Sequence, residues 1–96
     1  MGGERIEIVD DTAERRYVVL VDGVGAGFLE SSVAGDVVTM PHTVVSPAFG
    51  GRGLAGRLVR RALDDAAAAG RTVIPSCSFV ADWIARHPGY ERLVQP

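Results

Sequence analysis

The feature that most constrains this chain is a glycine-rich turn between a strand and a helix. Residues 44–59 read VVSPAFGGRGLAGRLV: an apolar strand end, Ser46-Pro47, four glycines at positions 50, 51, 53 and 56, and an amphipathic helical pattern. Glycine allows positive φ angles and close approach of another group. The helix start adds unpaired N–H groups and the positive end of the helix dipole. Such a turn is suited to holding a phosphate or pyrophosphate, although an ordinary strand–turn–helix junction has the same pattern.

Two common glycine-loop motifs fit this turn poorly. A Walker loop requires a Gly-Lys-Ser/Thr sequence, and the chain contains no Lys. Residues 51–56, GRGLAG, match the G-x-G-x-x-G fingerprint of dinucleotide binding. The acidic residues that follow, Asp64 and Asp65, fall inside the next predicted helix, whereas the fingerprint needs one after a second strand. The dinucleotide interpretation is therefore weak.

The rest of the chain alternates short apolar stretches with turn residues. This pattern predicts strands at 5–9, 16–21, 25–31, 37–45 and 72–74, and helices at 54–69 and 79–86. The first helix places its apolar residues on one face: Leu54, Leu58, Val59, Ala62, Leu63 and Ala66. Because this helix crosses between the last two strands, the fifth strand is expected to run parallel to the fourth. We therefore predict an α+β fold whose mixed sheet has about five strands, the first four mainly antiparallel, with two helices.

Length and composition bound the class of protein. Ninety-six residues predict one domain, residues 1–96. No apolar run approaches the roughly 20 residues that span a bilayer, so no membrane partner is expected. The single cysteine, Cys77, allows no internal disulfide, and no Cys/His set has zinc spacing. A net charge of −2 does not favour nucleic acid as a partner. We expect a cytoplasmic, metal-free protein that is a monomer or a weak homodimer.

The glycine turn resembles the cofactor loop of the GCN5-related N-acetyltransferases. Their motif reads Q/R-x-x-G-x-G/A between a strand and a helix. Residues 50–55, GGRGLA, supply Gly53 and Ala55 at the small positions, but Gly50 replaces the Gln or Arg. The segments HTVVSP and IPSCSFVADWIARHPGY are similar to a very small branch of this family, often called the YjdJ type.

A second family motif lies near the C-terminus. Many members carry N-x-x-A after the next strand and G-F several residues later. Here Ser78 to Ala81 and Gly89-Tyr90 occupy those places, with Ser78 for the Asn and Tyr90 for the Phe. The near-helical spacing of Phe79, Trp83 and Tyr90 places these aromatic residues in the expected core.

The resemblance implies that the chain uses acetyl-CoA as a co-substrate. The expected cofactor-binding residues are Thr43, Val44, Val45, Gly50, Gly51, Arg52, Gly53, Leu54, Ala55, Gly56, Arg57 and Ser78. Arg52 and Arg57 are the candidates for phosphate contacts, because cations near a helix start are unfavourable unless an anion is present. Pro41 lacks an N–H, so the fourth strand is expected at an edge or a bulge. The family fold implies that this strand splays from the fifth and that the pantetheine arm lies in the gap.

Two side chains are candidates for chemistry. Cys77 follows the fifth strand at a helix start, where a thiol pKa is lowered; it is either an acetyl acceptor, an acid toward the departing CoA thiolate, or a small buried residue. His42, on the fourth strand, is either a general base or a structural residue. Many family members protonate the thiolate with a Tyr seven residues after the Asn. That position is Ala85 here, so the usual acid is missing.

Three functions remain open at this stage. The resemblance predicts transfer of an acetyl group from acetyl-CoA to an amine of an unknown small molecule or protein. The alternative is a CoA- or acyl-CoA-binding module with little or no turnover. Without the resemblance, the chain is a small strand–helix protein whose glycine loop holds another anion or a protein partner. The chain lacks the helices that the family usually places between its first strands, so the acceptor side is expected to be unusually open.

Overall fold

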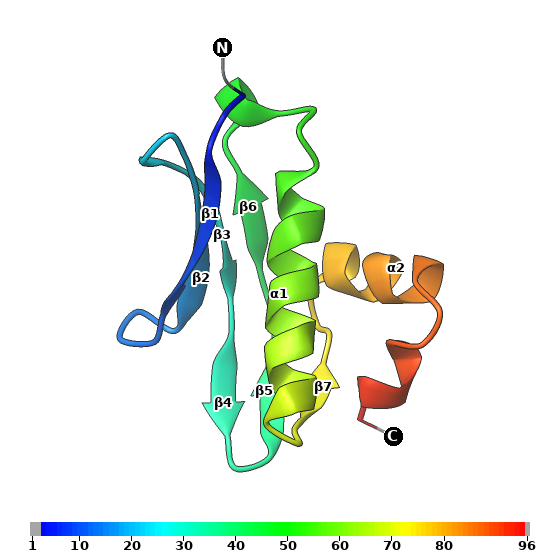
Figure 1. Ribbon diagram of the computed structural model, residues 1–96. Helices are drawn as coiled ribbons and strands as arrows, with labels where there is room; N and C mark the ends of the chain where they lie inside the picture. Colours follow the sequence, from blue (N-terminus) through cyan, green and yellow to red (C-terminus); the bar gives the residue numbers. More distant parts are fainter. Residues whose placement is uncertain (1–2, 96) are drawn as a thin grey trace.

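The computed structural model describes residues 3–95 (Figure 1). Its elements are β1 (Ile6–Asp11), β2 (Arg16–Val21), β3 (Val24–Glu30), β4 (Ser32–Ala34), β5 (Val37–Thr39), β6 (Thr43–Val45), the 3₁₀ turn η1 (Pro47–Phe49), α1 (Leu54–Ala68), β7 (Thr72–Ile74), α2 (Ser78–Arg86) and the 3₁₀ turn η2 (Glu91–Leu93). The predicted α+β class with two α-helices and a mixture of antiparallel and parallel strands is confirmed.

The strands form two sheets instead of one. The first has the order β1-β2-β3-β6 and is antiparallel throughout; the second has the order β4-β5-β7, in which β5 and β7 are parallel. The predicted strand 37–45 is divided into β5 and β6, and the chain beyond β3 adds β4 to the second sheet. The parallel pairing across α1 was predicted, whereas the division into two sheets was not.

Pro41 marks the point where the chain changes sheets. The N–H of Met40 donates to the carbonyl of Ile74 at 3.0 Å, on the side of β7. Two residues later, the carbonyl of His42 accepts from the N–H of Glu30 at 2.8 Å, on the side of β3. Because Pro41 has no N–H to donate to either ladder, the change of partner falls at this residue. The two sheets therefore diverge here, and β6 and β7 do not pair.

Helix α1 lies against one face of the four-stranded sheet and joins both sheets in one hydrophobic cluster. Its buried residues are the six that the sequence predicts: Leu54, Leu58, Val59, Ala62, Leu63 and Ala66. Asp65 on the same helix accepts a 2.8 Å hydrogen bond from the Tyr17 hydroxyl of β2. The helix ends at Ala68, one residue before the predicted end, and Gly70, which has a φ of +71°, follows its C-cap residue Ala69.

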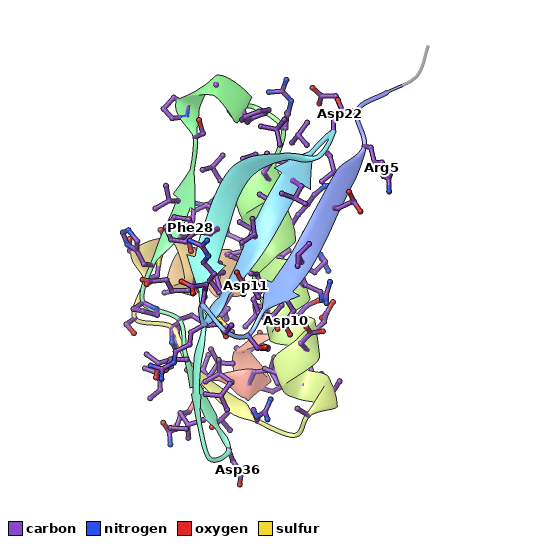
Figure 2. The ribbon with its side chains drawn as sticks, turned by 90° about the vertical axis from the view of Figure 1, so that its left-hand side faces the viewer. Arg5, Asp10, Asp11, Asp22, Phe28 and Asp36 are labelled. Atoms are coloured by element: carbon purple, nitrogen blue, oxygen red, sulfur yellow. The ribbon has the colours of Figure 1, made fainter. Side chains whose placement is uncertain are left out.

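The opposite face of the four-stranded sheet carries no helix among residues 3–95. In Figure 2 this face is turned toward the viewer, and α1 lies behind the sheet. No helix in the described part of the chain is long and apolar enough to cross a bilayer.

Candidate active site

The glycine turn has the backbone geometry of an anion cradle. Gly51 and Gly53 adopt positive φ angles of 80° and 69°, and no other group lies within 4 Å of where their Cβ atoms would be. Gly53 is the N-cap of α1 and makes no side-chain cap. The first intrahelical bond runs from the N–H of Arg57 to the carbonyl of Gly53 at 3.2 Å. The N–H groups of the preceding turn of α1 therefore have no helical acceptor and are available to a ligand.

A hollow of about 270 Å³ opens beside this turn. Eight of the residues predicted to bind the cofactor line it: Val45, Gly50, Gly51, Arg52, Gly53, Leu54, Ala55 and Gly56. Two further residues line it that were not predicted to do so, Phe49 and Phe79. The prediction that Phe79 lies in the core is wrong, because its side chain is 41% exposed. The buried stripe of α2 is Val80, Trp83 and Ile84, and that i, i+3, i+4 spacing was the available signal that Phe79 lies off the core face.

The two loop arginines differ in their surroundings. Arg52 forms a bidentate ion pair with Glu4, with Nε 2.7 Å from Oε1 and Nη2 2.8 Å from Oε2. The hydrogen bond from Arg52 holds the pKa of the Glu4 carboxyl below its ordinary value. Arg57 is exposed and takes part in no ion pair among residues 3–95. Arg57 therefore carries a positive charge that no neighbouring carboxylate neutralises.

The free edge of β6 faces the gap between the two sheets. The His42 carbonyl and the Ser46 N–H both bond to β3, so the backbone groups of even-numbered residues point toward that strand. Strand alternation turns the N–H and C=O groups of Thr43 and Val45 to the other edge. Of the three β6 residues predicted to bind cofactor, Thr43 and Val45 turn their backbone groups toward the free edge of β6, and Val44 turns its backbone groups toward β3.

Cys77 sits at the N-terminus of α2 on the gap side of β6. Its N–H donates to the Met40 carbonyl at 2.9 Å, and its Sγ lies 3.6 Å from the Thr43 hydroxyl. Burial raises the pKa of the thiol, but the N–H groups of Val80 and Phe79 and the hydroxyl and N–H of Thr43 together outweigh burial and lower it below its ordinary value. The Cys77 side chain makes no capping hydrogen bond to the start of α2. The amides of Phe79 and Val80 therefore lower the thiol pKa through the orientation of their N–H groups toward the sulfur.

His42 and Cys77 lie on opposite sides of the sheet. His42 was predicted to lie within a strand; it lies in the break between β5 and β6 and is exposed. Its ring centroid is 6.2 Å from that of Phe28, on the face that no helix covers. The adjacent residue, Thr43, points the other way toward Cys77, as strand alternation requires. The structure therefore does not bring the two candidate catalytic side chains together on one face.

The remaining predicted positions lie around the hollow or beyond it. Thr43, Val44, Arg57 and Ser78 do not line it, and Ser78 is the exposed first residue of α2. Gly56 has a packing role of its own, because a Cβ there would lie 3.3 Å from Nε1 of Trp83. Ala85, at the position of the missing Tyr, is exposed.

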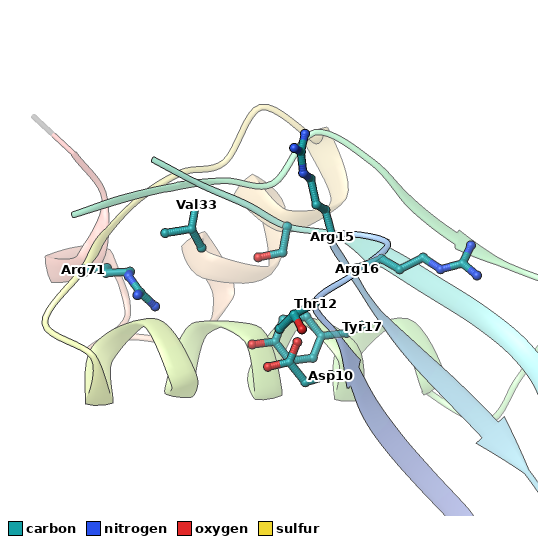
Figure 3. Close-up of a pocket in the computed structure, with 8 residues that line it drawn as sticks. Asp10, Thr12, Arg15, Arg16, Tyr17, Val33 and Arg71 are labelled. Carbon is teal, nitrogen blue, oxygen red and sulfur yellow. The ribbon is translucent and has the colours of Figure 1, made fainter. Parts of the chain in front are cut away.

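A separate cavity of about 340 Å³ lies between the β1–β2 turn and the segment after α1. Arg15, Arg16 and Arg71 are among its lining residues. Figure 3 shows that the side chains of Arg15 and Arg16 point in different directions, away from Asp10 and Tyr17. The guanidinium groups therefore do not converge on one anion. Within residues 3–95, no three His, Cys, Asp or Glu side chains are grouped as metal ligands.

Comparison with protein families gives one match that covers most of the chain. Residues 16–93 match the model of a family described as GCN5-related N-acetyl-transferase. Comparison with curated proteins gives no significant match.

Solved structures give further matches, all at low sequence identity. A ribosomal-protein alanine N-acetyltransferase from Escherichia coli has a TM-score of 0.63 and 20% identity, covering 92% of this chain and 54% of that one. N-acetylglutamate synthase from Neisseria gonorrhoeae, complexed with coenzyme A and N-acetyl-glutamate, has a TM-score of 0.58 and 19% identity, and the match covers 75% of this chain and 18% of that one. An aminoglycoside N-acetyltransferase in complex with CoA has a TM-score of 0.54 and 20% identity, and the match covers 84% of this chain and 59% of that one. These likenesses show a shared fold, and the chain spans less than two thirds of each of these proteins.

Proposed function

This chain belongs to the GCN5-related N-acetyltransferase family, and from that premise we propose that it transfers an acetyl group from acetyl-CoA to an amine. One observation carries the proposal. The glycine turn leads into the free edge of β6, and that edge leads to the thiol of Cys77, so an anion site, backbone partners and a reactive group follow one another along the gap. We propose that residues 1–96 act as one domain, because one hydrophobic cluster unites both sheets and both helices.

The residues present suit the phosphate end of the co-substrate. Gly51 and Gly53 leave space where a side chain would otherwise stand, and the N–H groups at the start of α1 point along the helix dipole toward it. Arg57 adds a cation that no carboxylate among residues 3–95 neutralises. Phe49 and Phe79 give the hollow apolar walls. We propose that this turn holds the pyrophosphate and that the backbone of Thr43 and Val45 bonds the pantetheine arm.

The chemistry is assigned to the far end of the gap. Acetyl-CoA, when bound, supplies an activated acetyl carbon whose C–S bond breaks when a nucleophile attacks it. With a lowered pKa, Cys77 is suited to one of two roles. As an acid, its thiol donates a proton to the leaving sulfur while the amine nitrogen bonds to the acetyl carbon. As a nucleophile, its thiolate first takes the acetyl group and then passes it to the amine. His42 lies on the other face of the sheet from Cys77, so we assign it no step at this thiol; the proton that the amine nitrogen releases passes to the Cys77 thiolate or to water.

The acceptor is an amine of a small molecule or a protein, and its identity is left open. A cytoplasmic location is part of the proposal, since a reducing compartment keeps the single free thiol available. The alternative is a CoA- or acyl-CoA-binding module with little turnover. Ala85 in place of the usual Tyr and the separation of His42 from Cys77 favour that alternative.

Two measurements test the proposal and separate it from the alternative. Calorimetry with acetyl-CoA tests binding, and release of free CoA in the presence of a panel of amines tests turnover. Binding with turnover supports the enzyme, and binding without turnover supports the module. Absence of binding would reject both. Mass spectrometry after incubation with acetyl-CoA alone then assigns Cys77: an adduct of one acetyl group that Cys77→Ser abolishes identifies the nucleophile.

A further inference from the structure

The face of the four-stranded sheet opposite α1 carries an ordered pattern of side chains. Strand register places Val9 opposite Val18, Val18 opposite Phe28, and Phe28 opposite Val44. One apolar residue from each of the four strands thus forms a continuous row across the face. Val9 and Val44 are 46% and 38% exposed. A shallow hollow of about 300 Å³ lies along this row, with Val18, Phe28 and Val44 among its lining residues.

A charged row runs beside the apolar row. Asp11 pairs with Arg16, Arg16 with Glu30, and the N–H of Glu30 bonds to the carbonyl of His42. Across β1, β2, β3 and the residue that precedes β6, the row therefore reads acid, base, acid, histidine. The Arg16 guanidinium lies over the Phe28 ring, 5.4 Å from its centroid, but its pairing with acid is weak. The nearest carboxylate oxygen, on Asp11, is 3.9 Å from Arg16 Nε, and that nitrogen has no hydrogen-bond partner in the described part of the chain.

The order of charges in this row is complementary to itself. If two such faces stack with a twofold axis parallel to the strands, the strand order of one copy is reversed over the other. β1 then lies over β6, and β2 over β3. Arg16 of each copy meets Glu30 of the other, and Asp11 meets His42. In the neighbouring row, Val9 meets Val44 and Val18 meets Phe28. This is an isologous contact between aligned sheets, in which every charge meets its opposite or a histidine.

We propose that this face is the interface of a homodimer, formed by the apolar row Val9, Val18, Phe28 and Val44 and the charged row Asp11, Arg16, Glu30 and His42. The apolar row supplies the burial, and the charged row fixes the twofold register, because like charges would meet in a shifted or inverted stack. The dimer also places Asp11 of the second copy beside His42 and gives Arg16 a carboxylate partner. The proposal does not depend on acetyl transfer, because it rests only on the outer face of the sheet.

Charge-reversal variants in pairs test the interface. In an Arg16→Glu homodimer, the introduced Glu of each copy faces Glu30 of the other, which gives two contacts between acids. In a Glu30→Arg homodimer, the introduced Arg of each copy faces Arg16 of the other, which gives two contacts between bases. Each variant alone is expected to dimerise at least tenfold more weakly than the wild-type chain. When the two variants are mixed, the introduced acid of one copy meets the introduced base of the other, and the native Arg16 meets the native Glu30, so a one-to-one dimer is expected to return. Sedimentation velocity over a concentration series measures all four samples, with circular dichroism confirming the fold.

The control is Arg86→Glu, because Arg86 is an exposed residue at the end of α2, away from this face. It makes the same change of charge as Arg16→Glu and should dimerise like the wild-type chain. Two results would overturn the proposal. One is a wild-type chain that remains monomeric at the highest concentration reached, which would leave the face to another partner such as a protein acceptor. The other is a mixture of the two reversal variants that stays as weak as each variant alone.

Discussion

The thiol of Cys77, near the gap between β6 and β7, has a pKa below its ordinary value. Burial alone would raise its pKa, and the amides of α2 and the Thr43 hydroxyl reverse that effect. At a given pH near neutrality, a larger fraction of this thiol is therefore thiolate than for an ordinary cysteine. The same shift suits a proton donor to a leaving sulfur and a nucleophile toward an acetyl group, so the pKa alone does not choose between those roles.

The Thr43 hydroxyl should be a measurable part of this shift. Thr43→Val keeps the shape of the side chain and removes the hydroxyl 3.6 Å from Sγ. Because that hydroxyl stabilises the thiolate, its loss should raise the pKa of Cys77, and the midpoint of the rate of alkylation by iodoacetamide against pH should move to higher pH. The wild-type midpoint should lie below that of a free cysteine. Ser76→Ala, an exposed neighbour, is the control. A midpoint that Thr43→Val leaves in place would show that the hydroxyl has no part in the shift.

Arg57 should contribute to binding and little to stability. Arg57→Ala should weaken CoA binding at least fivefold, about 1 kcal/mol, and should reduce the dependence of the dissociation constant on salt, because one cation near the phosphates is lost. The melting temperature of the apo protein should barely change, since Arg57 makes no ion pair in the described chain. Arg86→Ala is the matched control. A destabilised apo protein with normal affinity would instead show a structural role.

Arg52 should behave differently from Arg57. Its guanidinium is already held by both oxygens of Glu4, so a ligand phosphate has to share it or displace the carboxylate. Calorimetry should therefore give a smaller loss of CoA affinity for Arg52→Ala than for Arg57→Ala. Glu4→Gln, which leaves Arg52 without its counter-charge, should tighten CoA binding. Equal losses for the two arginine variants, or no gain from Glu4→Gln, would mean that the ion pair does not compete with the ligand.

At the scale of elements, the glycine turn is the strongest determinant of the proposed site. Gly53 has a φ of +69°, whereas Gly50 has a φ of −64° and a ψ of 159° that any residue adopts. Gly53→Val should therefore strain the turn, place a side chain where the phosphate must approach, and weaken CoA binding at least tenfold, about 1.4 kcal/mol. Gly50→Ala, whose Cβ would come no closer than 3.4 Å to a neighbour, is the matched control and should bind normally. Unchanged affinity in a folded Gly53→Val protein would contradict the assignment of the turn to phosphate.

The elements themselves were largely predictable because their signals are local. The buried stripe of α1, the hairpin at Asp22-Gly23 and the helix end at Gly70 follow from periodicity and from residues that accept positive φ angles. The division of the predicted strand 37–45 into β5 and β6 was only partly predictable. Pro41 indicated an edge or a bulge, but not a change of sheet. Ile74 and Glu30, the partners on its two sides, are distant in sequence, and hydrophobic alternation carries no information about them.

The residues of the candidate site were also predictable only where their signals are local in sequence. The motif located the loop residues, since they are contiguous in sequence. Strand alternation within 42–44 would have separated His42 from Thr43, but assigning Cys77 to one face required the hydrogen bond from its N–H to Met40. The ion pair between Arg52 and Glu4 joins residues 48 positions apart, and no local pattern in the sequence indicates it.

At the scale of the whole molecule, the proposed site lies where two small sheets diverge. β6 ends the first sheet, β7 ends the second, and α1 and the chain around Pro41 connect them. A ligand that bonds the edge of β6, the start of α1 and the start of α2 would therefore link parts of the molecule that the sheet ladders leave unpaired. Such a ligand binds only the folded state, so its binding should add directly to stability.

Acetyl-CoA should consequently raise the melting temperature by a large amount for so small a protein. At 100 times its dissociation constant, a ligand specific for the folded state adds about 2.7 kcal/mol, which corresponds to a rise of roughly 10 °C or more in a domain of this length. Gly53→Val should reduce this rise at the same ligand concentration, because its phosphate contacts are weakened, whereas Gly50→Ala should retain it. Hydrogen exchange should show the added protection at β6, the first turn of α1 and the first turn of α2, since these are the proposed contacts. Protection confined to β1 and β2, which lie on the far side of the first sheet from the free edge of β6, would place the ligand elsewhere.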